Sequence, residues 1–154
     1  MEKITLTIKD ILQLEQELNG SVNADTKEVI YNGFIKQNLP IFLKYQLADL
    51  CGTLSAEKKV VDELRNDLIR KYGEAGENGI IMVNMMEEVK DEDGKVIGQK
   101  FNPKYLELDK EFSEFVLNTV KEIEYPEITE EDLKKIGDSK DDYKLIFKLV
   151  KKPS

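Results

Sequence analysis

The side chains that could do chemistry in this 154-residue chain are carboxylates, because the sequence contains no histidine and a single cysteine. Without histidine, no histidine-based triad, Cys–His pair or imidazole metal site can form. Two neighbouring pairs, Glu87 with Glu88 and Glu122 with Glu124, remain as candidates for general acid–base catalysis. Such pairs arise by chance among 31 acids. We therefore interpret them as solvated surface and expect no enzyme, no metal site and no cofactor.

Two patterns that resemble ligand loops lack the residues that the chemistry needs. The glycine-rich stretch 73–79 is interleaved with Glu74 and Glu77, which would repel phosphate. The acidic turn 91–94 does not fit an EF-hand. If Gly94 is aligned with the invariant glycine of the calcium loop, an apolar residue takes the first position and a basic residue the last, where carboxylates must bind calcium. We interpret the single cysteine, Cys51, as a buried and unreactive thiol.

The elements that would position these residues follow from the spacing of apolar side chains, which predicts a mainly helical α+β fold. Alternation predicts strands at 2–8, 79–89, 95–101 and 143–150, and an extended segment at 123–128. Helical spacing predicts helices at 8–19, 25–38, 39–72, 102–120 and 129–137. We expect one domain over 1–150, in which a long kinked helix or helical hairpin packs on a second helix and a small antiparallel sheet. A loose tail, 151–154, would follow.

Capping residues support several of these boundaries. Thr7 can cap the first helix and Gly20 can end it. Asn102–Pro103 is a typical helix start. Thr129 with Asp132 predicts a capping box.

A long apolar stripe follows Pro40, which must break or kink the preceding helix. Its residues recur in steps of four and three, which is typical of a helix packed against another helix. They are Leu39, Leu43, Leu47, Leu50, Leu54, Val61, Leu64 and Leu68. An uncovered stripe of this length would exceed the apolar patches of soluble monomers. We therefore predict self-association as a dimer through the stripe. The alternative, which stays open, is a hairpin that turns near Gly52 and buries the stripe within one chain.

The net charge of −8 is concentrated in the segment 107–132, where ten acids face two lysines. The candidate acidic face within it consists of Glu107, Asp109, Glu111, Glu114, Glu122 and Glu124. An acidic field disfavours nucleic acid as a partner and permits a basic protein, although acids also simply solubilise an exposed helix. No apolar stretch approaches the ~20 residues of a membrane span, so we expect no membrane partner.

Three methionines, Met82, Met85 and Met86, lie in the strand predicted at 79–89. Methionine serves both as an adaptable contact surface and as a filler of gaps in a core. We interpret these three as core.

The order of features resembles small proteins of unknown function encoded by bacteriophages and prophages. The stretches that carry the resemblance are Lys3–Leu6, the charged helix 62–73, the turn 91–95, the helix 112–115, and 122–128 leading into Leu133. The resemblance implies a viral protein in the cytoplasm of a bacterial host, or one associated with the virion. It assigns no catalytic residue.

Together these features predict a non-enzymatic protein that binds a host or viral protein, such as a host-defence factor. One alternative is a structural or assembly component of a phage particle. Another is a binder of small molecules or nucleotides, or a small carboxylate-dependent enzyme. A deep pocket lined by convergent polar groups would favour this last alternative.

Overall fold

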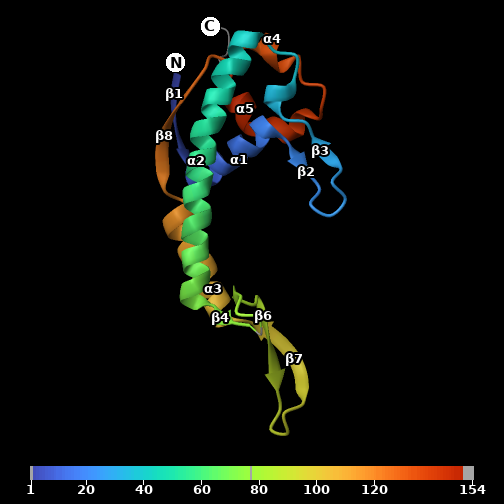
Figure 1. Cartoon of the computed structure of the whole chain (residues 1–154), viewed down its shortest axis with the longest axis vertical. Helices are drawn as coiled ribbons and strands as arrows, with labels where there is room; N and C mark the ends of the chain where they lie inside the picture. Colours follow the sequence, from blue (N-terminus) through green and yellow to red (C-terminus); the bar gives the residue numbers. More distant parts are fainter. Residues whose placement is uncertain (1, 77, 151–154) are drawn as a thin grey trace. The chain divides into compact units, whose positions relative to one another are not determined.

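The computed structural model describes residues 2–76 and 78–150, and their contacts divide the chain into two compact units (Figure 1). Unit 1 holds the described residues up to Lys59 and from Val120 onward, and unit 2 holds those from Val60 to Thr119. The long helix α2 (Ile41–Tyr72) contributes residues to both units. This division is finer than the one domain expected over 1–150. The predicted tail, 151–154, lies outside the described residues.

Helices and small two-stranded antiparallel sheets make up the fold, which confirms the predicted mainly helical α+β class. In unit 1, β1 pairs with β8, with Ile4 opposite Ile123, and β2 pairs with β3. The elements of unit 1 besides its part of α2 are β1 (Glu2–Thr7), α1 (Ile8–Asn19), β2 (Ser21–Val22), β3 (Val29–Tyr31), η1 (Phe34–Lys36), β8 (Val120–Tyr125), α4 (Glu130–Leu133), η3 (Lys140–Tyr143) and α5 (Lys144–Leu149).

The core of unit 1 is built from the apolar faces of α1, α2 and α5. Ile11 and Leu14 of α1, Leu47 and Leu54 of α2, and Ile146 of α5 are fully buried. The predicted caps are present at the starts of α1 and α4. Thr7 Oγ1 accepts from the backbone N of Asp10 at 3.2 Å, and the capping box at Thr129 is present. Local side-chain to backbone bonds of this kind fix where a helix starts.

The helix predicted at 25–38 is wrong. The chain there forms β3 and the 3₁₀ turn η1 instead. Gly33 has φ +94°, a conformation outside the helical region. Residues Val29 to Tyr31 are β-branched and aromatic, and they pair with β2.

The strand predicted at 143–150 is also wrong, because this segment forms the helix α5. The buried side chains are Leu145, Ile146 and Leu149, a helical spacing. Glu17 of α1 supplies the cap, since its Oε1 accepts from the backbone N of Leu145 at 2.8 Å and of Ile146 at 3.1 Å. Burial raises the pKa of the Glu17 carboxyl.

The helix α2 runs unbroken for 32 residues, so the predicted hairpin near Gly52 is wrong. Pro40 stands just before it, as expected of a proline at a helix start, and its carbonyl accepts from the backbone N of Lys44 at 3.0 Å. Gly52 is exposed, and a Cβ built on it would meet nothing within 4 Å. Among the residues described, no helix combines the length and apolarity that crossing a membrane requires.

Unit 2 consists of the end of α2 and a β-rich segment that leads into a helix. Its further elements are β4 (Glu74–Ala75), β5 (Ile81–Met82), β6 (Met86–Lys90), β7 (Val96–Phe101), α3 (Pro103–Glu111) and η2 (Phe112–Leu117), a turn of π-helix. The predicted hairpin is confirmed as β6–β7, with Gly94 in its turn at φ +80°. The strand predicted at 79–89 is split into β5 and β6. The expected single sheet does not form, because β6–β7 is a separate two-stranded sheet.

Candidate functional site

The apolar stripe of α2 is core and not a free surface. In unit 1, Leu43, Leu47, Leu50 and Leu54 are between 0% and 7% exposed. In unit 2, Val61 and Leu68 are also buried, and only Leu64 is exposed, at 42%. The prediction of an exposed interaction stripe is therefore wrong for every member except Leu64, and the stripe is not a surface on which to build a dimer.

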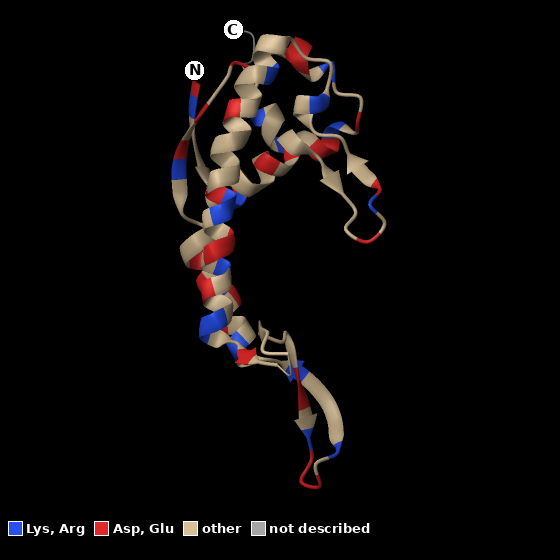
Figure 2. Cartoon of the chain, viewed as in Figure 1, with Lys and Arg blue, Asp and Glu red and all other residues tan. Residues whose placement is uncertain are grey.

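The six residues of the candidate acidic face lie in different units. Glu107, Asp109, Glu111 and Glu114 belong to unit 2, while Glu122 and Glu124 lie on β8 of unit 1. Lys3 lies within 4 Å of both carboxylates on β8, and Glu111 pairs with Lys71. Figure 2 shows basic residues interspersed with acidic ones along α2. The structure thus does not gather these six acids within one unit.

The most extensive polar network of unit 1 closes its loops. The Asp138 carboxylate accepts from the hydroxyl of Tyr143 at 2.7 Å, from Gln37 Nε2 at 3.0 Å and from Asn32 Nδ2 at 3.1 Å. Burial and this carboxylate hold the pKa of Tyr143 well above its usual value, so the hydroxyl stays protonated. The Tyr143 oxygen also accepts from the backbone N of Gly33 at 3.2 Å. The groups of this network are thus paired with one another and hold the loops of unit 1 together.

Cys51 is likewise unsuited to chemistry. It is buried on α2, and burial raises the pKa of its thiol to about 11. The thiol is therefore protonated at neutral pH and is a poor nucleophile. No group of three or more metal-ligating side chains comes together among the residues that the structure describes.

Unit 2 leaves a larger share of its large apolar side chains exposed than unit 1 does. Across the described residues, unit 1 buries 21 apolar side chains and exposes eight large ones, whereas unit 2 buries three and exposes eleven. The eleven are Val60, Leu64, Ile80, Ile81, Met82, Met85, Val96, Ile97, Phe101, Leu106 and Phe115. Soluble proteins rarely leave most of the large apolar side chains of a unit in water unless the surface has a use.

Four of these residues are close together in sequence, in the segment 80–85, which we call the methionine segment. Ile80 is 60% exposed, Ile81 40%, Met82 57% and Met85 51%. The interpretation of the methionines as core is therefore wrong for Met82 and Met85, while Met86 is half-buried. An exposed, unbranched and polarisable side chain suits a surface that adapts to a partner.

The backbone of the methionine segment is held in place from two sides. On one side β5 pairs with β4, and a Cβ on Gly73 would lie 2.7 Å from Ile81 Cγ2 and 2.8 Å from the carbonyl oxygen of Met82. On the other side Asn102 donates from Nδ2 to the carbonyl of Asn84 at 2.9 Å and from its backbone N to that of Met85 at 2.9 Å. The segment is thus pre-organised, which lowers the entropy lost when a partner binds.

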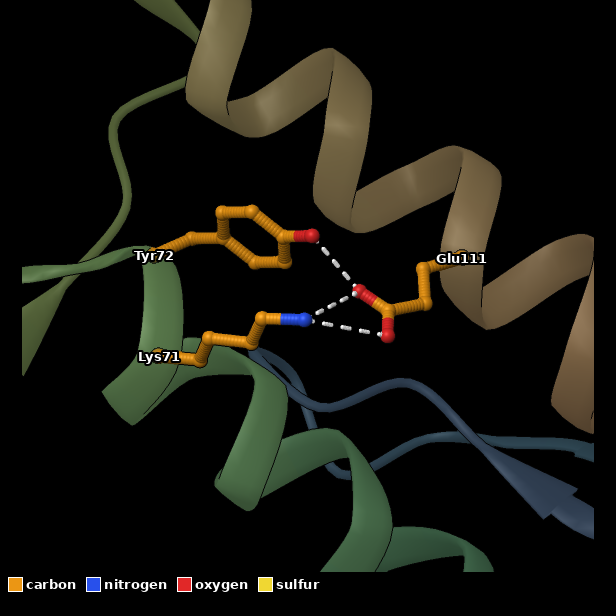
Figure 3. A network of polar contacts seen from close by, with 3 residues as sticks. All are labelled: Lys71, Tyr72 and Glu111. Carbon is orange, nitrogen blue, oxygen red and sulfur yellow. Dashed lines mark hydrogen bonds and ion pairs between the residues drawn. The ribbon is translucent and has the colours of Figure 1, made fainter.

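Within unit 2, a polar cluster joins the end of α2 to α3 (Figure 3). The Tyr72 hydroxyl donates to Glu111 Oε2 at 2.6 Å, and Lys71 Nζ lies 3.3 Å from both carboxylate oxygens. Lys71 Nζ also sits 5.0 Å from the centre of the Tyr72 ring. The hydrogen bond from Tyr72 is the main cause that lowers the pKa of Glu111. The cluster has a structural role, since each of its groups is already paired.

A cavity of about 730 Å³ borders the methionine segment within unit 2. It is half open, and its charged lining consists of Glu74, Glu87, Glu88, Lys90 and Lys104. Lys104 pairs with Glu74 at 3.1 Å, and Lys100 pairs with Glu87 at 3.3 Å. The carboxylates would oppose a nucleotide phosphate. The charge of this lining is therefore unfavourable for a nucleotide.

Sequence reasoning missed the methionine segment as a site, although one signal was present. The signal is the stretch 80–86, whose residues are apolar except for Asn84 and do not alternate with polar ones as in a strand with one buried face. No protein-family model, curated protein or solved structure matches this chain.

Proposed function

We propose that this chain is a non-enzymatic protein-interaction protein, and that the methionine segment of unit 2 is its main docking surface. The observation that carries the proposal is the imbalance within unit 2, which exposes eleven large apolar side chains and buries three. Covering such a surface with a partner removes apolar area from water, which favours association. The anchored backbone of the segment adds to this, because a rigid surface loses little entropy on binding.

The charge of unit 2 supports a partner with basic residues around an apolar contact. Unit 2 carries 14 acidic residues against eight basic ones, a net charge of −6 out of the −8 of the whole chain. Glu74, Glu87 and Glu88 line the cavity beside Met82. A lysine or arginine of the partner that enters this cavity would find opposite charge, while its apolar neighbours cover the methionines.

The resemblance in layout to phage and prophage proteins supports a phage-encoded binder of a host or viral protein. A host-directed binder forms small complexes in the cytoplasm of the infected cell. An assembly component, the second candidate, would instead copurify with particles.

Two glutamates placed on the methionine segment should abolish partner capture. The double variant Met82→Glu/Met85→Glu adds charge where the partner must exclude water, so we expect recovery of the partner to fall at least about tenfold. The measurement is quantitative pull-down with the tagged full chain from host lysates, infected and uninfected. Because both methionines are more than half exposed, the variant should fold normally, which circular dichroism will check.

The matched control is Val22→Glu/Ile30→Glu, which adds the same charge to exposed strand residues of unit 1. Val22 is 57% exposed and Ile30 60%, close to the methionines. This control should capture the partner as the wild type does. Equal capture by all three proteins, or no specific partner in any lysate, would overturn the proposal.

A further inference from the structure

The sequence contains three Asn–Gly pairs, at residues 19–20, 32–33 and 78–79. In such a pair the backbone nitrogen of the glycine can attack the side-chain carbon Cγ of the asparagine, because glycine has no Cβ to hinder the approach. The new N–Cγ bond closes a five-membered succinimide ring as the Cγ–Nδ2 bond breaks, and ammonia leaves with the amide proton of the glycine. Water then opens the ring at either carbonyl, which gives aspartate or isoaspartate. The structure around each pair decides whether it can react.

The first pair is closed to this reaction by contacts within unit 1. Asn19 Nδ2 donates to Glu15 Oε1 at 2.9 Å, and the backbone N of Gly20 donates to the carbonyl of Gln16 at 2.8 Å. A Cβ built on Gly20 would lie 2.6 Å from the backbone oxygen of Asn32, so this turn is closely packed. The side chain and the nitrogen that must meet are therefore each bound to a different group.

The second pair is held in the same way by Asp138 and Tyr143. Asn32 Nδ2 donates to Asp138 Oδ1 at 3.1 Å, and the backbone N of Asn32 donates to Oδ2 at 3.2 Å. The backbone N of Gly33, which would have to attack, donates to the Tyr143 hydroxyl at 3.2 Å. Gly33 is also buried. Ring closure at Asn32 would break these bonds, so we expect the folded chain to protect this pair.

The third pair lies on the surface of unit 2. Asn78 and Gly79 are both exposed in the stretch between β4 and β5, and a Cβ on Gly79 would meet nothing within 4 Å. The backbone N of Gly79 donates to the carbonyl of Gly76 at 3.0 Å. Gly76 is exposed as well, so this bond can open locally while the rest of the unit stays folded. Asn78 can therefore reach the geometry of ring closure in the native protein.

We propose that Asn78 is a site of spontaneous deamidation, and that its isoaspartate product loosens the anchor of the methionine segment. An isoaspartate adds one carbon to the backbone between β4 and β5 and a negative charge beside it. These two strands pair through two residues each, and next to them the backbone N of Gly76 donates to the carbonyl of Ile80 at 2.9 Å. The register of a hairpin is set by the length of its loop, so a longer loop strains a pairing this short.

Peptide mapping by mass spectrometry, after storage of the full chain in mildly alkaline buffer, tests the site. Asn78 should convert to aspartate and isoaspartate at least about tenfold faster than Asn19 or Asn32, because these two must wait for unit 1 to open. In denaturing urea the three pairs should react at similar rates, because the contacts that protect two of them are gone. The proposal is wrong if Asn78 of the folded chain reacts no faster than the other two, or stays intact over the time in which the chain in urea converts.

Amide hydrogen exchange tests the effect on the anchor. The amide of Gly76 should exchange at least about tenfold faster in the deamidated fraction that an isoaspartyl methyltransferase can label than in the unmodified chain, because its bond to Ile80 is weakened. The amide of Gly33, in unit 1, should be unchanged. Asn78→Asp is the matched control, since it adds the charge without lengthening the backbone, and it should exchange as the wild type does. Equal exchange at Gly76 in the isoaspartate form would overturn the loosened anchor. These measurements involve no partner, so they stand apart from the outcome of the docking proposal.

Discussion

Replacing Leu47 by alanine should lower the free energy of unfolding by about 3 kcal/mol, the usual result of truncating a fully buried leucine. Leu47 is 0% exposed on α2, in the core of unit 1. Alanine removes its contacts and leaves a cavity that the neighbouring helices cannot fill. Urea unfolding followed by circular dichroism gives the loss as a lower midpoint with an unchanged slope.

The matched variant is Leu64→Ala, because Leu64 lies on the same helix as Leu47 and belongs to the same apolar stripe. Leu64 is 42% exposed in unit 2, so its truncation should lower the free energy of unfolding by less than about 1 kcal/mol. Equal losses for the two variants would mean that a partner copy covers Leu64. Such a result would favour the dimer through the apolar stripe, which the sequence predicts. The burial of the other leucines of the stripe argues against that dimer.

Gly33→Ala should destabilise unit 1 by about 4 kcal/mol or more, because two costs add at this position. The backbone φ of Gly33 is +94°, a region that side chains rarely occupy. A Cβ there would also lie 2.5 Å from the backbone C of Asn19 and the backbone N of Gly20, which cannot move aside. Since a small domain has only about 5–15 kcal/mol of stability, thermal unfolding should show a fall in Tm of well over ten degrees, or no folded protein.

Gly79→Ala separates the two causes. Gly79 also has a positive φ, +72°, but a Cβ on it would meet nothing within 4 Å. Its replacement should therefore lower stability by only about 1–2 kcal/mol, the cost of the backbone conformation. If Gly33→Ala proved as mild as Gly79→Ala, the close packing of the turn at Gly33 against the end of α1 would be wrong.

The elements that the sequence predicts correctly are those whose cause lies in residues close to one another along the chain. Thr7, Asn102 and the Thr129–Asp132 box each make their bonds within four residues, so the pattern and the cause lie in the same short stretch. The β6–β7 hairpin likewise depends on a local turn at Gly94. Local causes of this kind can be recognised in a single sequence.

The segments predicted wrongly depend on distant residues. Leu145, Phe147 and Leu149 alternate as in a strand, yet the chain forms a helix there because Glu17, over a hundred positions earlier, caps it. In the same way, the turn at Gly33 is held by Tyr143. No local pattern reports such contacts, since tertiary structure overrides weak local preferences.

The candidate site was missed for a related reason. An apolar residue type predicts burial only if the fold offers something to cover it, and this is not visible from the residue itself. Met82 and Met85 lie in a unit that buries only three apolar side chains among its described residues. The stripe of α2 shows the converse, since its pattern predicts an interaction surface and the structure buries all of its residues except Leu64.

The central claim, that the methionine segment docks a protein partner, is tested most directly by methionine oxidation footprinting. Peroxide converts accessible methionines to the sulfoxide, and mass spectrometry reads each residue separately. In the purified chain, Met82 and Met85 should oxidise rapidly. In the complex captured from lysate, both should be protected at least about tenfold, because a docked partner excludes the oxidant. Oxidation of Met82 and Met85 at the same rate in the complex as in the purified chain would contradict the claim.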